Sequence, residues 1–415
     1  MAKNKDMKKY DVLIVGGGMV GASLACSLAA KTSLSIGVIE AKKLPQQTSQ
    51  GDLSQHFNPS YDERSTALSL GTCRYLETIG VWQSLQQHVE KIHHIHVSEQ
   101  GKFGVTCLDR EEEGVEFLGA VVENAWLGVV LGAAMAAQSG IRLHSPAQVK
   151  SLQASDEGYR VCVEENGKSE ELHCGLLVVA DGANSTCCKM LSIPQTQEDY
   201  EQTALVANLT PKRPHQNIAY ERFTQIGPMA LLPLRDERLA LVLTLPSEEL
   251  EHYQAMSNAG FMGAVDQAIG GRCDGFSKVG QRVSYPLRLI RAEQQILPGC
   301  VVVGNAAHSL HPIAGQGFNL SLRDVAILTE EVMGAIEQTI PLGTFSVLQR
   351  YIERRDLDQH ATIQFSDKLQ KLFTAKVPGL GVARSVGLTV FDFWPTGKRA
   401  LARQAMGLMA GVSTF

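Results

Sequence analysis

The sequence predicts a doubly wound α/β domain with a second, mostly antiparallel β domain and a helical C-terminal region. At 415 residues the chain exceeds the roughly 250–300 residues at which a single core stops growing, so we expect more than one domain. Three continuous apolar runs end at a glycine or an acidic residue, which is typical of strands buried on both faces of a parallel sheet. Shorter apolar stretches joined by polar turns lie between them and indicate antiparallel strands.

The three apolar runs occur near the start, in the middle and late in the chain. They are Asp11–Val15 before Gly16, Leu176–Ala180 before Asp181 and Gly182, and Cys300–Val303 before Gly304 and Asn305. We therefore expect the chain to leave the parallel domain twice to build the second domain. The parallel domain is predicted over 8–88, 121–193 and 289–340, the second domain over 89–120 and 194–288, and the helical region over 341–415.

The second domain is predicted from six short apolar segments. They are His93–Val97, Phe103–Cys107, Val115–Gly119, Ala204–Leu209, Ala230–Leu234 and Leu239–Leu245, with Arg235–Arg238 as a hairpin turn. Ala125–Ala137 is apolar throughout but shorter than the roughly 18–20 residues that span a bilayer, so it indicates a buried helix. From Thr344 onward the pattern is helical, with breaks at Pro378 and Pro395.

Composition indicates a soluble protein of the cytoplasm. Apolar residues make up 44% and charged residues 20% of the chain, and its net charge is −5, so we expect no nucleic-acid partner. The nine cysteines show no metal or redox spacing, which favours reduced thiols. We expect no metal site, because the histidines between 88 and 96 have no matching carboxylate or cysteine set. They are His88, His93, His94 and His96.

The first apolar run is followed by a glycine fingerprint, Gly16-x-Gly18-x-x-Gly21. Glycines at this spacing permit a tight turn, close approach of the backbone to a pyrophosphate, and close packing of helix on strand. The helix that begins at Met19 and Val20 would direct its N-terminal dipole at the phosphates. Glu40 follows a second strand, Leu34–Ile39, where a carboxylate would accept hydrogen bonds from a ribose. This pattern predicts a dinucleotide site and by itself does not separate FAD from NAD.

Three motifs in a fixed order identify a resemblance. After the glycine fingerprint come Val178–Ser185 (VVADGANS) and Gly304–His308 (GNAAH). With these motifs the sequence resembles the flavin-dependent aromatic hydroxylases of the p-hydroxybenzoate hydroxylase type over roughly residues 8 to 340. Three further stretches are most similar to the ubiquinone-biosynthesis branch of that group. They are Asp62–Ser69, Ile95–Gly104 and His308–Leu320.

The resemblance implies FAD as the cofactor and assigns residues to it. Arg64 would contact the pyrophosphate or ribityl chain, and Asp181 and Gly182 would line the groove where FAD and a nicotinamide nucleotide approach. The residues assigned to the cofactor are Gly16, Gly18, Met19, Val20, Gly21, Glu40, Arg64, Asn124, Asp181, Gly182, Gly304, Asn305, Gly315, Gly317, Phe318 and Asn319. Asn305 departs from the family pattern, which has a ribityl-binding Asp there. Its amide oxygen can still accept a hydroxyl hydrogen bond, without charge assistance.

The resemblance also implies a reaction. NAD(P)H would reduce the flavin, O₂ would add at its C4a carbon, and the hydroperoxide would hydroxylate a polyprenylated phenol. The chain has no second glycine fingerprint, so NAD(P)H would use the flavin cleft transiently. His311 and Pro312 are predicted beside the reactive flavin edge, where His311 would accept a proton or orient the substrate. Capping of the following helix, Leu320–Glu331, is an equal alternative for His311.

Other functions fit the same fold. A reductase or an epoxidase of a prenyl lipid is one alternative, and a non-catalytic prenyl-lipid binding or assembly protein is another. Residues 368–415 carry seven basic residues and one acid, which suits peripheral contact at the inner face of a membrane or binding to a protein of the ubiquinone pathway. A packed helix pair with a solvated basic face explains the same composition. The sequence leaves homo-oligomer formation open.

Overall fold

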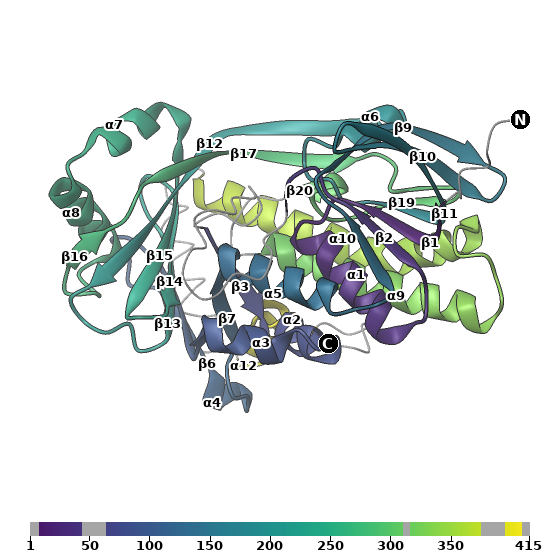
Figure 1. Cartoon of the computed structure of the whole chain (residues 1–415). Coiled ribbons are helices and arrows are strands. Elements are labelled where there is room, and N and C mark those ends of the chain that lie inside the picture. The colour runs from purple at the N-terminus through teal and green to yellow at the C-terminus, as the bar shows by residue number, and fades with distance from the viewer. Residues whose placement is uncertain (1–7, 44–63, 310–315, 375–394, 409–415) are drawn as a thin grey trace, which may run out of the picture.

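The computed structural model describes residues 8–43, 64–309, 316–374 and 395–408. Their strands form three sheets, and the first of these carries the helices of the parallel domain (Figure 1). The expected α/β architecture is confirmed: parallel and antiparallel sheets occur in one chain, and helices follow at its C-terminal end.

The first sheet has the strand order β18-β19-β11-β1-β2-β8, with β10 and β9 added along β11. The pairs β1–β11, β1–β2, β2–β8 and β11–β19 are parallel. The strand bounds are β1 Lys8–Val15, β2 Ile36–Ile39, β8 Ile141–His144, β9 Ala147–Ser155, β10 Gly158–Glu165, β11 Lys168–Val179, β18 Ile296–Leu297 and β19 Cys300–Val302. All three apolar runs of the sequence therefore lie in this sheet.

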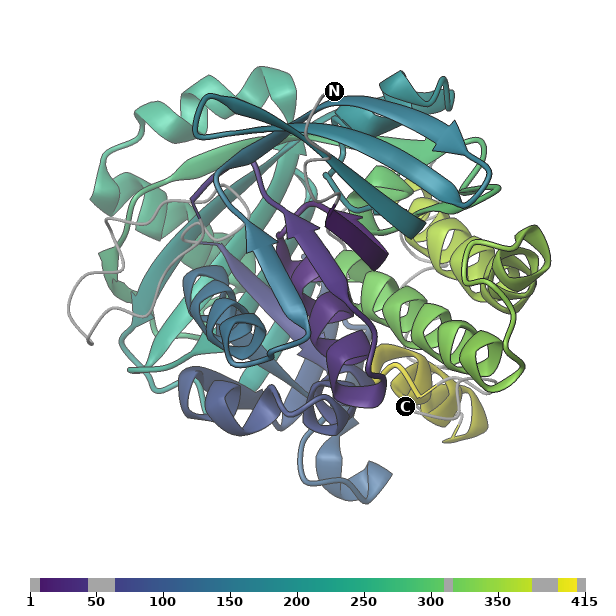
Figure 2. The same ribbon diagram turned by 45° about the vertical axis from the view of Figure 1, so that its right-hand side comes forward.

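Both faces of the parallel sheet are covered, as its continuous apolar strands require. Val12 and Ile14 of β1 pack in one core with the helices, whereas Leu13 and Val15 pack in a second core with β10, β11 and α6. The helix bounds are α1 Met19–Lys31, α5 Asn124–Ala136, α6 Thr186–Met190, α9 Gln316–Glu337 and α10 Phe345–Thr374. Helices α9 and α10 lie side by side, as the green helices of Figure 2 show.

The second sheet has the order β20-β17-β12-β15-β14-β13-β5-β6, with β16 beside β12. Its pairs are antiparallel except for β13 and β5, which are parallel. The bounds are β5 His94–Glu99, β6 Val105–Asp109, β12 Gln195–Pro211, β13 Ile218–Phe223, β14 Pro228–Leu234, β15 Arg238–Pro246, β16 Phe276–Val279, β17 Val283–Ala292 and β20 His308–Ser309. The expected antiparallel character is thus present, and the turn between β14 and β15 falls where the sequence predicts it.

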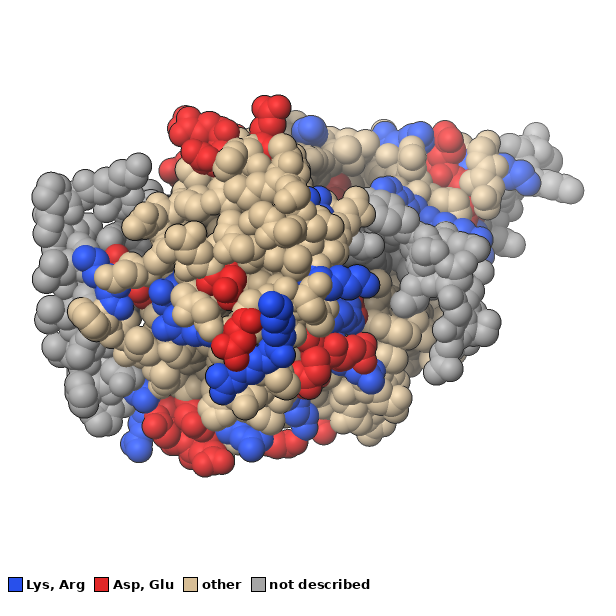
Figure 3. Space-filling model, turned by 90° about the vertical axis from the view of Figure 1, so that its left-hand side faces the viewer, with Lys and Arg blue, Asp and Glu red and all other residues tan. Residues whose placement is uncertain are grey.

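Two helices, α7 (Leu250–Ala255) and α8 (Asn258–Ile269), cover the outer face of the second sheet. Phe261 and Val265 of α8 pack there against strand residues such as Leu231 and Leu241. Figure 3 shows the molecule from this end, and basic and acidic residues are interspersed on the visible surface. That pattern is typical of an ordinary solvated face.

A small third sheet pairs β7 (Gly119–Glu123) with β3 (Ser65–Ser69) and β4 (Val89–Ile92). The prediction of a strand over Val115–Gly119 is wrong. Asp109 accepts a hydrogen bond from the Glu111 N–H and so begins a short helix, α4 (Arg110–Glu113), which Gly114 ends in the left-handed region with φ of 66°. The strand starts only at Gly119, because capping residues on both sides favour the helix over an extended chain.

The remaining helices complete the cores and the C-terminal region. They are α2 Leu70–Thr78, α3 Trp82–Leu85 and α12 Pro395–Ala405, with 3₁₀ turns η3 Gln86–His88, η4 Ser247–Glu249 and η5 Gly304–Ala306. The break predicted at Pro395 is confirmed as the first residue of α12. The break predicted at Pro378 lies outside the described residues. In the described ranges, no helix is both long and apolar enough to cross a membrane.

Candidate flavin site

The three motifs of the sequence meet at one edge of the parallel sheet, because parallel strands end on the same side. Backbone hydrogen bonds connect the segments that leave this edge. The Gly16 N–H donates to the Ile39 carbonyl at 2.8 Å, and the Ala180 N–H donates to the Val15 carbonyl at 2.8 Å. The Val303 N–H donates to the Val179 carbonyl at 2.9 Å. The loops after β1, β2, β11 and β19 are therefore held together as one surface.

Glycine is required at two places in the first loop. Gly16 has φ of +108°, and a Cβ placed there would lie 2.3 Å from the Ala180 carbonyl oxygen. A Cβ at Gly21 would lie 1.9 Å from the Gly16 carbonyl oxygen. Both distances are far below van der Waals contact, so any side chain would force the loop away from β11 or α1.

Helix α1 begins at this loop with an uncapped N-terminus. Gly18 is the N-cap residue, and no side chain accepts a hydrogen bond from the first turn. In that turn, Val20 lies against the third motif: a Cβ at Gly304, whose φ is +65°, would lie 3.1 Å from Val20 Cγ1. The N–H groups and the positive end of the helix dipole are thus presented at the edge of the sheet, where a pyrophosphate would be stabilised.

Glu40 lies beside the glycine loop. One carboxylate oxygen accepts a hydrogen bond from the Gly17 N–H at 2.8 Å, and the other accepts one from the Lys42 N–H at 2.9 Å. A carboxylate has about four acceptor positions, so two remain for ribose hydroxyl groups. Glu40 thus holds the loop in place and still has acceptor positions with which it could bind a ribose.

Asp181 and Gly182 follow β11 at the same edge. One oxygen of Asp181 accepts a hydrogen bond from the Cys187 N–H of α6 at 3.0 Å. Its other oxygen, Oδ1, is buried and has no hydrogen-bond partner among the described residues. A Cβ at Gly182 would meet nothing within 4 Å. A buried acceptor beside open space suits a ligand that brings its own hydroxyl donors.

The third motif combines an exposed amide with a buried charge network that the sequence analysis did not assign. The Asn305 side chain is exposed, whereas His308 three residues later is buried and its Nε2 lies 2.7 Å from Asp324 Oδ2 of α9. Asp324 also accepts a hydrogen bond from Arg355 Nε of α10 at 2.6 Å and from Gln359 at 2.9 Å. The GNAAH motif offered a signal for this network, because a histidine in an otherwise apolar stretch needs a buried partner.

Arg64 and Asn124 connect the third sheet to its surroundings. The Arg64 guanidinium carbon lies 4.4 Å from the ring centroid of Tyr285 on β17, so Arg64 contacts the second sheet. The Asn124 N–H donates to the Arg64 carbonyl at 2.8 Å, and its side-chain oxygen accepts a hydrogen bond from Thr66 at 2.7 Å. Asn124 is buried, so its contacts position Arg64.

The residues assigned at the start of α9 take different places. The Asn319 amide accepts a hydrogen bond from the Ser69 N–H at 2.9 Å and donates to the Ala67 carbonyl at 2.8 Å, so it fastens α9 to β3. Phe318 packs against the main core, and a Cβ added at Gly317 would meet nothing within 4 Å. The other residues predicted here, His311, Pro312 and Gly315, lie outside the described residues.

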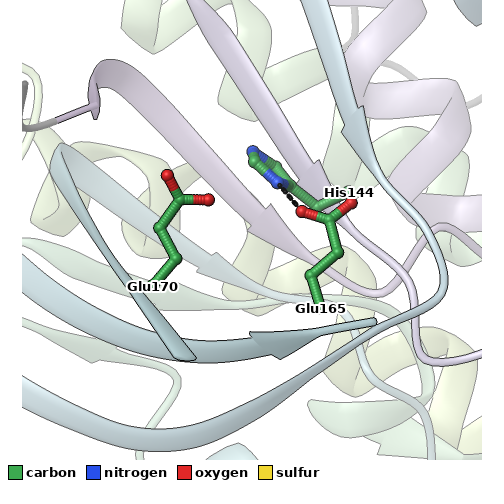
Figure 4. A group of neighbouring side chains, drawn as sticks. All are labelled: His144, Glu165 and Glu170. Carbon is green, nitrogen blue, oxygen red and sulfur yellow. Dashed lines mark hydrogen bonds and ion pairs between the residues drawn. The ribbon is translucent and has the colours of Figure 1, made fainter. Parts of the chain in front are cut away.

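One further cluster has the residue types of a metal site: His144, Glu165 and Glu170 lie together on β8, β10 and β11 (Figure 4). Their polar atoms already have protein partners. His144 Nδ1 lies 3.1 Å from Glu165, its Nε2 lies 2.8 Å from the Tyr10 hydroxyl, and Glu170 pairs with Lys8 at 2.7 Å. These contacts account for the cluster as a partly buried polar network between strands of the first sheet.

The cysteines provide no nucleophile at this edge. All nine are unpaired, in agreement with the expectation of reduced thiols. Burial raises the pKa of Cys26 to about 12 and that of Cys187, beside Asp181, further still. A thiol with a raised pKa is protonated near neutral pH and is unreactive.

The glycine loop, the uncapped helix, Glu40 and the unpartnered oxygen of Asp181 fit FAD and define a flavin-dependent oxidoreductase of the doubly wound α/β class. A family model described as FAD binding domain matches residues 9–366. The chain belongs to this family and is an FAD-dependent monooxygenase.

Two hydroxylases are among the relatives that match over nearly the whole chain. Ubiquinone hydroxylase UbiL of Rhodospirillum rubrum is 31% identical over 403 residues, covering 97% of this chain and 90% of the relative. The 3-demethoxyubiquinol 3-hydroxylase of Escherichia coli is 29% identical over 402 residues, covering 96% and 98%. This agrees with the predicted resemblance to the ubiquinone-biosynthesis branch.

Solved structures share the fold at low sequence identity. The p-nitrophenol 4-monooxygenase PnpA from Pseudomonas putida gives a TM-score of 0.75 at 14% identity, covering 97% of this chain and 99% of that one. PqsL, a probable FAD-dependent monooxygenase from Pseudomonas aeruginosa, gives 0.74 at 18% identity, covering 92% and 99%. The predicted fold class is confirmed.

Proposed function

We propose that this monooxygenase hydroxylates the aromatic ring of a polyprenylated phenol in ubiquinone biosynthesis, with NAD(P)H and O₂ as co-substrates. The observation that carries the proposal is the match to UbiL at 31% identity over 97% of the chain. The run His311–Asn319 supports it, because it is most similar to 2-octaprenyl-6-methoxyphenol hydroxylase.

In this proposal the described residues hold the cofactor by distinct contacts. The loop from Gly16 to Gly18 and the N-terminus of α1 would bind the pyrophosphate. Glu40 would bind the adenosine ribose, and Asp181 and Asn305 would accept hydrogen bonds from sugar or ribityl hydroxyl groups. Bound FAD supplies the redox chemistry, because it carries electrons from NAD(P)H to O₂. His311 and Pro312 stay proposed at the substrate edge of the flavin.

The test is genetic and chemical. Deletion of the gene should make a prenylated phenol lacking one ring hydroxyl accumulate, and the purified yellow protein should convert that lipid with consumption of NAD(P)H and O₂. Accumulation of an unsaturated or unepoxidised prenyl lipid would favour a reductase or an epoxidase. A colourless protein that restores the pathway would favour the assembly role.

His311 has its own test. His311→Ala should lower hydroxylation or uncouple it, so that NAD(P)H oxidation releases hydrogen peroxide. Measurement of product and peroxide per NAD(P)H distinguishes the two outcomes. Unchanged turnover and coupling would leave His311 a helix-capping residue.

We further propose that the enzyme contacts an anionic membrane surface through exposed cations near its C-terminus. The substrate is too apolar to diffuse freely, since each buried methylene contributes about 0.8 kcal/mol. Ala402 of α12 and Met406, the residue after the helix, pack in the protein core. Lys398 of α12 pairs with Glu112 at 2.9 Å. The exposed charges of the helix are Arg399 and Arg403. Electrostatic attraction through these two arginines is therefore what α12 offers a membrane, rather than insertion of its apolar face.

A further inference from the structure

One row of side chains crosses the inner face of the second sheet and is only half buried. Strand register places the row's members directly beside one another on six strands. The row consists of Val97, Glu221, Ala230, Val242, Val206 and Val283. Every member is partly exposed, whereas outer-face neighbours on the same strands such as Leu205, Leu231 and Leu241 are at most 1% exposed. We call this set the Glu221 row.

The Glu221 row faces the parallel domain. Side chains alternate between the two faces of a strand, and Ala219, two residues before Glu221, packs in the main core with residues of the parallel domain. The intervening residue, Tyr220, packs instead with the helices on the outer face. The row is therefore on the inner side of the sheet.

The row also lies next to the residue expected to reach the flavin. Tyr285 is on β17 two residues after Val283, which belongs to the row, and so shares its face. The Arg64 guanidinium stacks on that tyrosine ring at 4.4 Å. The Val283 end of the Glu221 row thus lies beside the Arg64 contact, and Glu221 lies four strands further across the same face of the sheet.

Glu221 is the one ionisable member of this apolar row. Its carboxyl has no hydrogen-bond or ion-pair partner within the described ranges, and the nearest titratable residue on the same face is Glu99, two positions along the adjacent strand. His96 and Arg222 have the opposite strand parity and lie on the outer face. Burial raises the pKa of Glu221 to about 8. An unpaired carboxyl in apolar surroundings costs stability, and such a cost is common where function requires the group.

We propose that the Glu221 carboxyl is the polar anchor of the substrate site and hydrogen-bonds an oxygen on the aromatic ring, while the valine and alanine side chains of its row contact the apolar parts of the substrate. The inference rests on the proposed function and names a residue that recognises its substrate. Because the raised pKa keeps the carboxyl protonated near neutral pH, it can both donate to and accept from a phenol or methoxy oxygen. An apolar wall with one hydrogen-bonding group matches a lipid with a small polar ring.

The test uses the full-length flavoprotein with Glu221→Leu and Glu221→Gln. Glu251→Leu on α7 is the matched control, because Glu251 is exposed beyond the outer face of the same sheet. A short-chain prenylated methoxyphenol is the probe, and its binding is read from flavin fluorescence as well as from KM and product per NAD(P)H. Glu221→Leu should weaken binding about tenfold, as expected for one lost hydrogen bond, and raise peroxide release. Glu221→Gln should stay within about threefold of wild type, since an amide also donates and accepts.

Two readouts separate an anchor from a structural residue. The wild-type KM should rise as pH passes about 8, because the ionised carboxyl no longer donates, and Glu221→Gln should lose this rise. Glu221→Leu should melt no lower than wild type, because it removes an unpaired carboxyl from apolar surroundings.

Wild-type binding in Glu221→Leu, a pH rise that persists in Glu221→Gln, or a leucine variant that melts several degrees lower would each overturn the inference. The proposed function fails separately: wild-type protein would then bind the probe without forming a hydroxylated product. Because binding is measured independently of turnover, the anchor is tested in either case.

Discussion

Single atoms at the glycine loop decide whether the site can form at all. The carbonyl oxygens of Gly16 and Ala180 occupy the positions that side chains at Gly21 and Gly16 would need. In the same loop, the Gly17 N–H donates a hydrogen bond to the carboxylate of Glu40. If these residues bind the flavin as we propose, a substitution that displaces the loop should also remove the cofactor.

Gly21→Ala should lose most of the bound flavin, because its new Cβ would lie 1.9 Å from the Gly16 carbonyl oxygen and displace the turn. Flavin absorbance per mole of purified protein measures this. Gly263→Ala in α8, where a Cβ meets nothing within 4 Å, is the matched control and should keep wild-type flavin. Equal flavin in both variants would show that the loop tolerates the shift.

Asn305→Asp should keep or raise FAD affinity, because it restores the carboxylate that the family carries at this place. The side chain is exposed in the described structure, so the added charge is not buried against protein. A charged acceptor is worth roughly 1.5–3 kcal/mol against about 1 for a neutral one. Titration of the apoprotein with FAD gives the answer, and complete flavin loss would place the residue elsewhere.

At the scale of elements, α9 and α10 are joined by buried charges rather than by apolar contacts alone. The Asp324 carboxylate on α9 is hydrogen-bonded to His308, Arg355 and Gln359. Arg355 also forms an ion pair at 2.7 Å with Asp358 on its own helix. Burial by itself would raise the pKa of Asp324, but Arg355 and His308 lower it more, to well below its usual range. The network connects the loop that carries Asn305 to two long helices.

Asp324→Asn should lower the free energy of unfolding by about 3–5 kcal/mol, the usual effect of breaking a buried ion pair. Because the folded-state pKa is depressed, the carboxylate stabilises the wild type above the ordinary carboxyl range, and that contribution is lost as pH falls below about 4. The variant should therefore lose part of the acid dependence of its melting temperature. Asp356→Asn, exposed on α10, should change the free energy by no more than about 0.5 kcal/mol.

Over the whole molecule, the proposed membrane contact depends on the exposed charges of α12. Sedimentation with anionic liposomes should show binding of wild type at low salt and release at high salt, since each basic residue near the surface contributes about 1 kcal/mol. Arg399→Ala with Arg403→Ala should bind less. Lys398→Ala is the control, because its charge is already paired with Glu112. Binding that survives salt and both substitutions would contradict an electrostatic contact through α12.

Sequence pattern alone determined the class of this protein. Apolar runs ending in Gly16, Asp181 and Gly304 predict parallel strands and a nucleotide edge, because strand burial and glycine turns are local properties of the chain. Local composition also gave one wrong prediction. Val115–Gly119 has the composition of a strand, yet the caps at Asp109 and Gly114 form a short helix just before it, and the strand starts only at Gly119.

Only the tertiary structure decided which polar residues connect one element of the fold to another. Asn319 and Asn124, which the resemblance assigns to the cofactor, bond through their amides to backbone and side-chain groups of β3. The Glu221 row gathers residues from position 97 to 283, and the buried partners of His308 come from two later helices. Periodicity states which side of a strand a residue takes, whereas strand register and helix docking, which depend on the whole core, determine what it meets there.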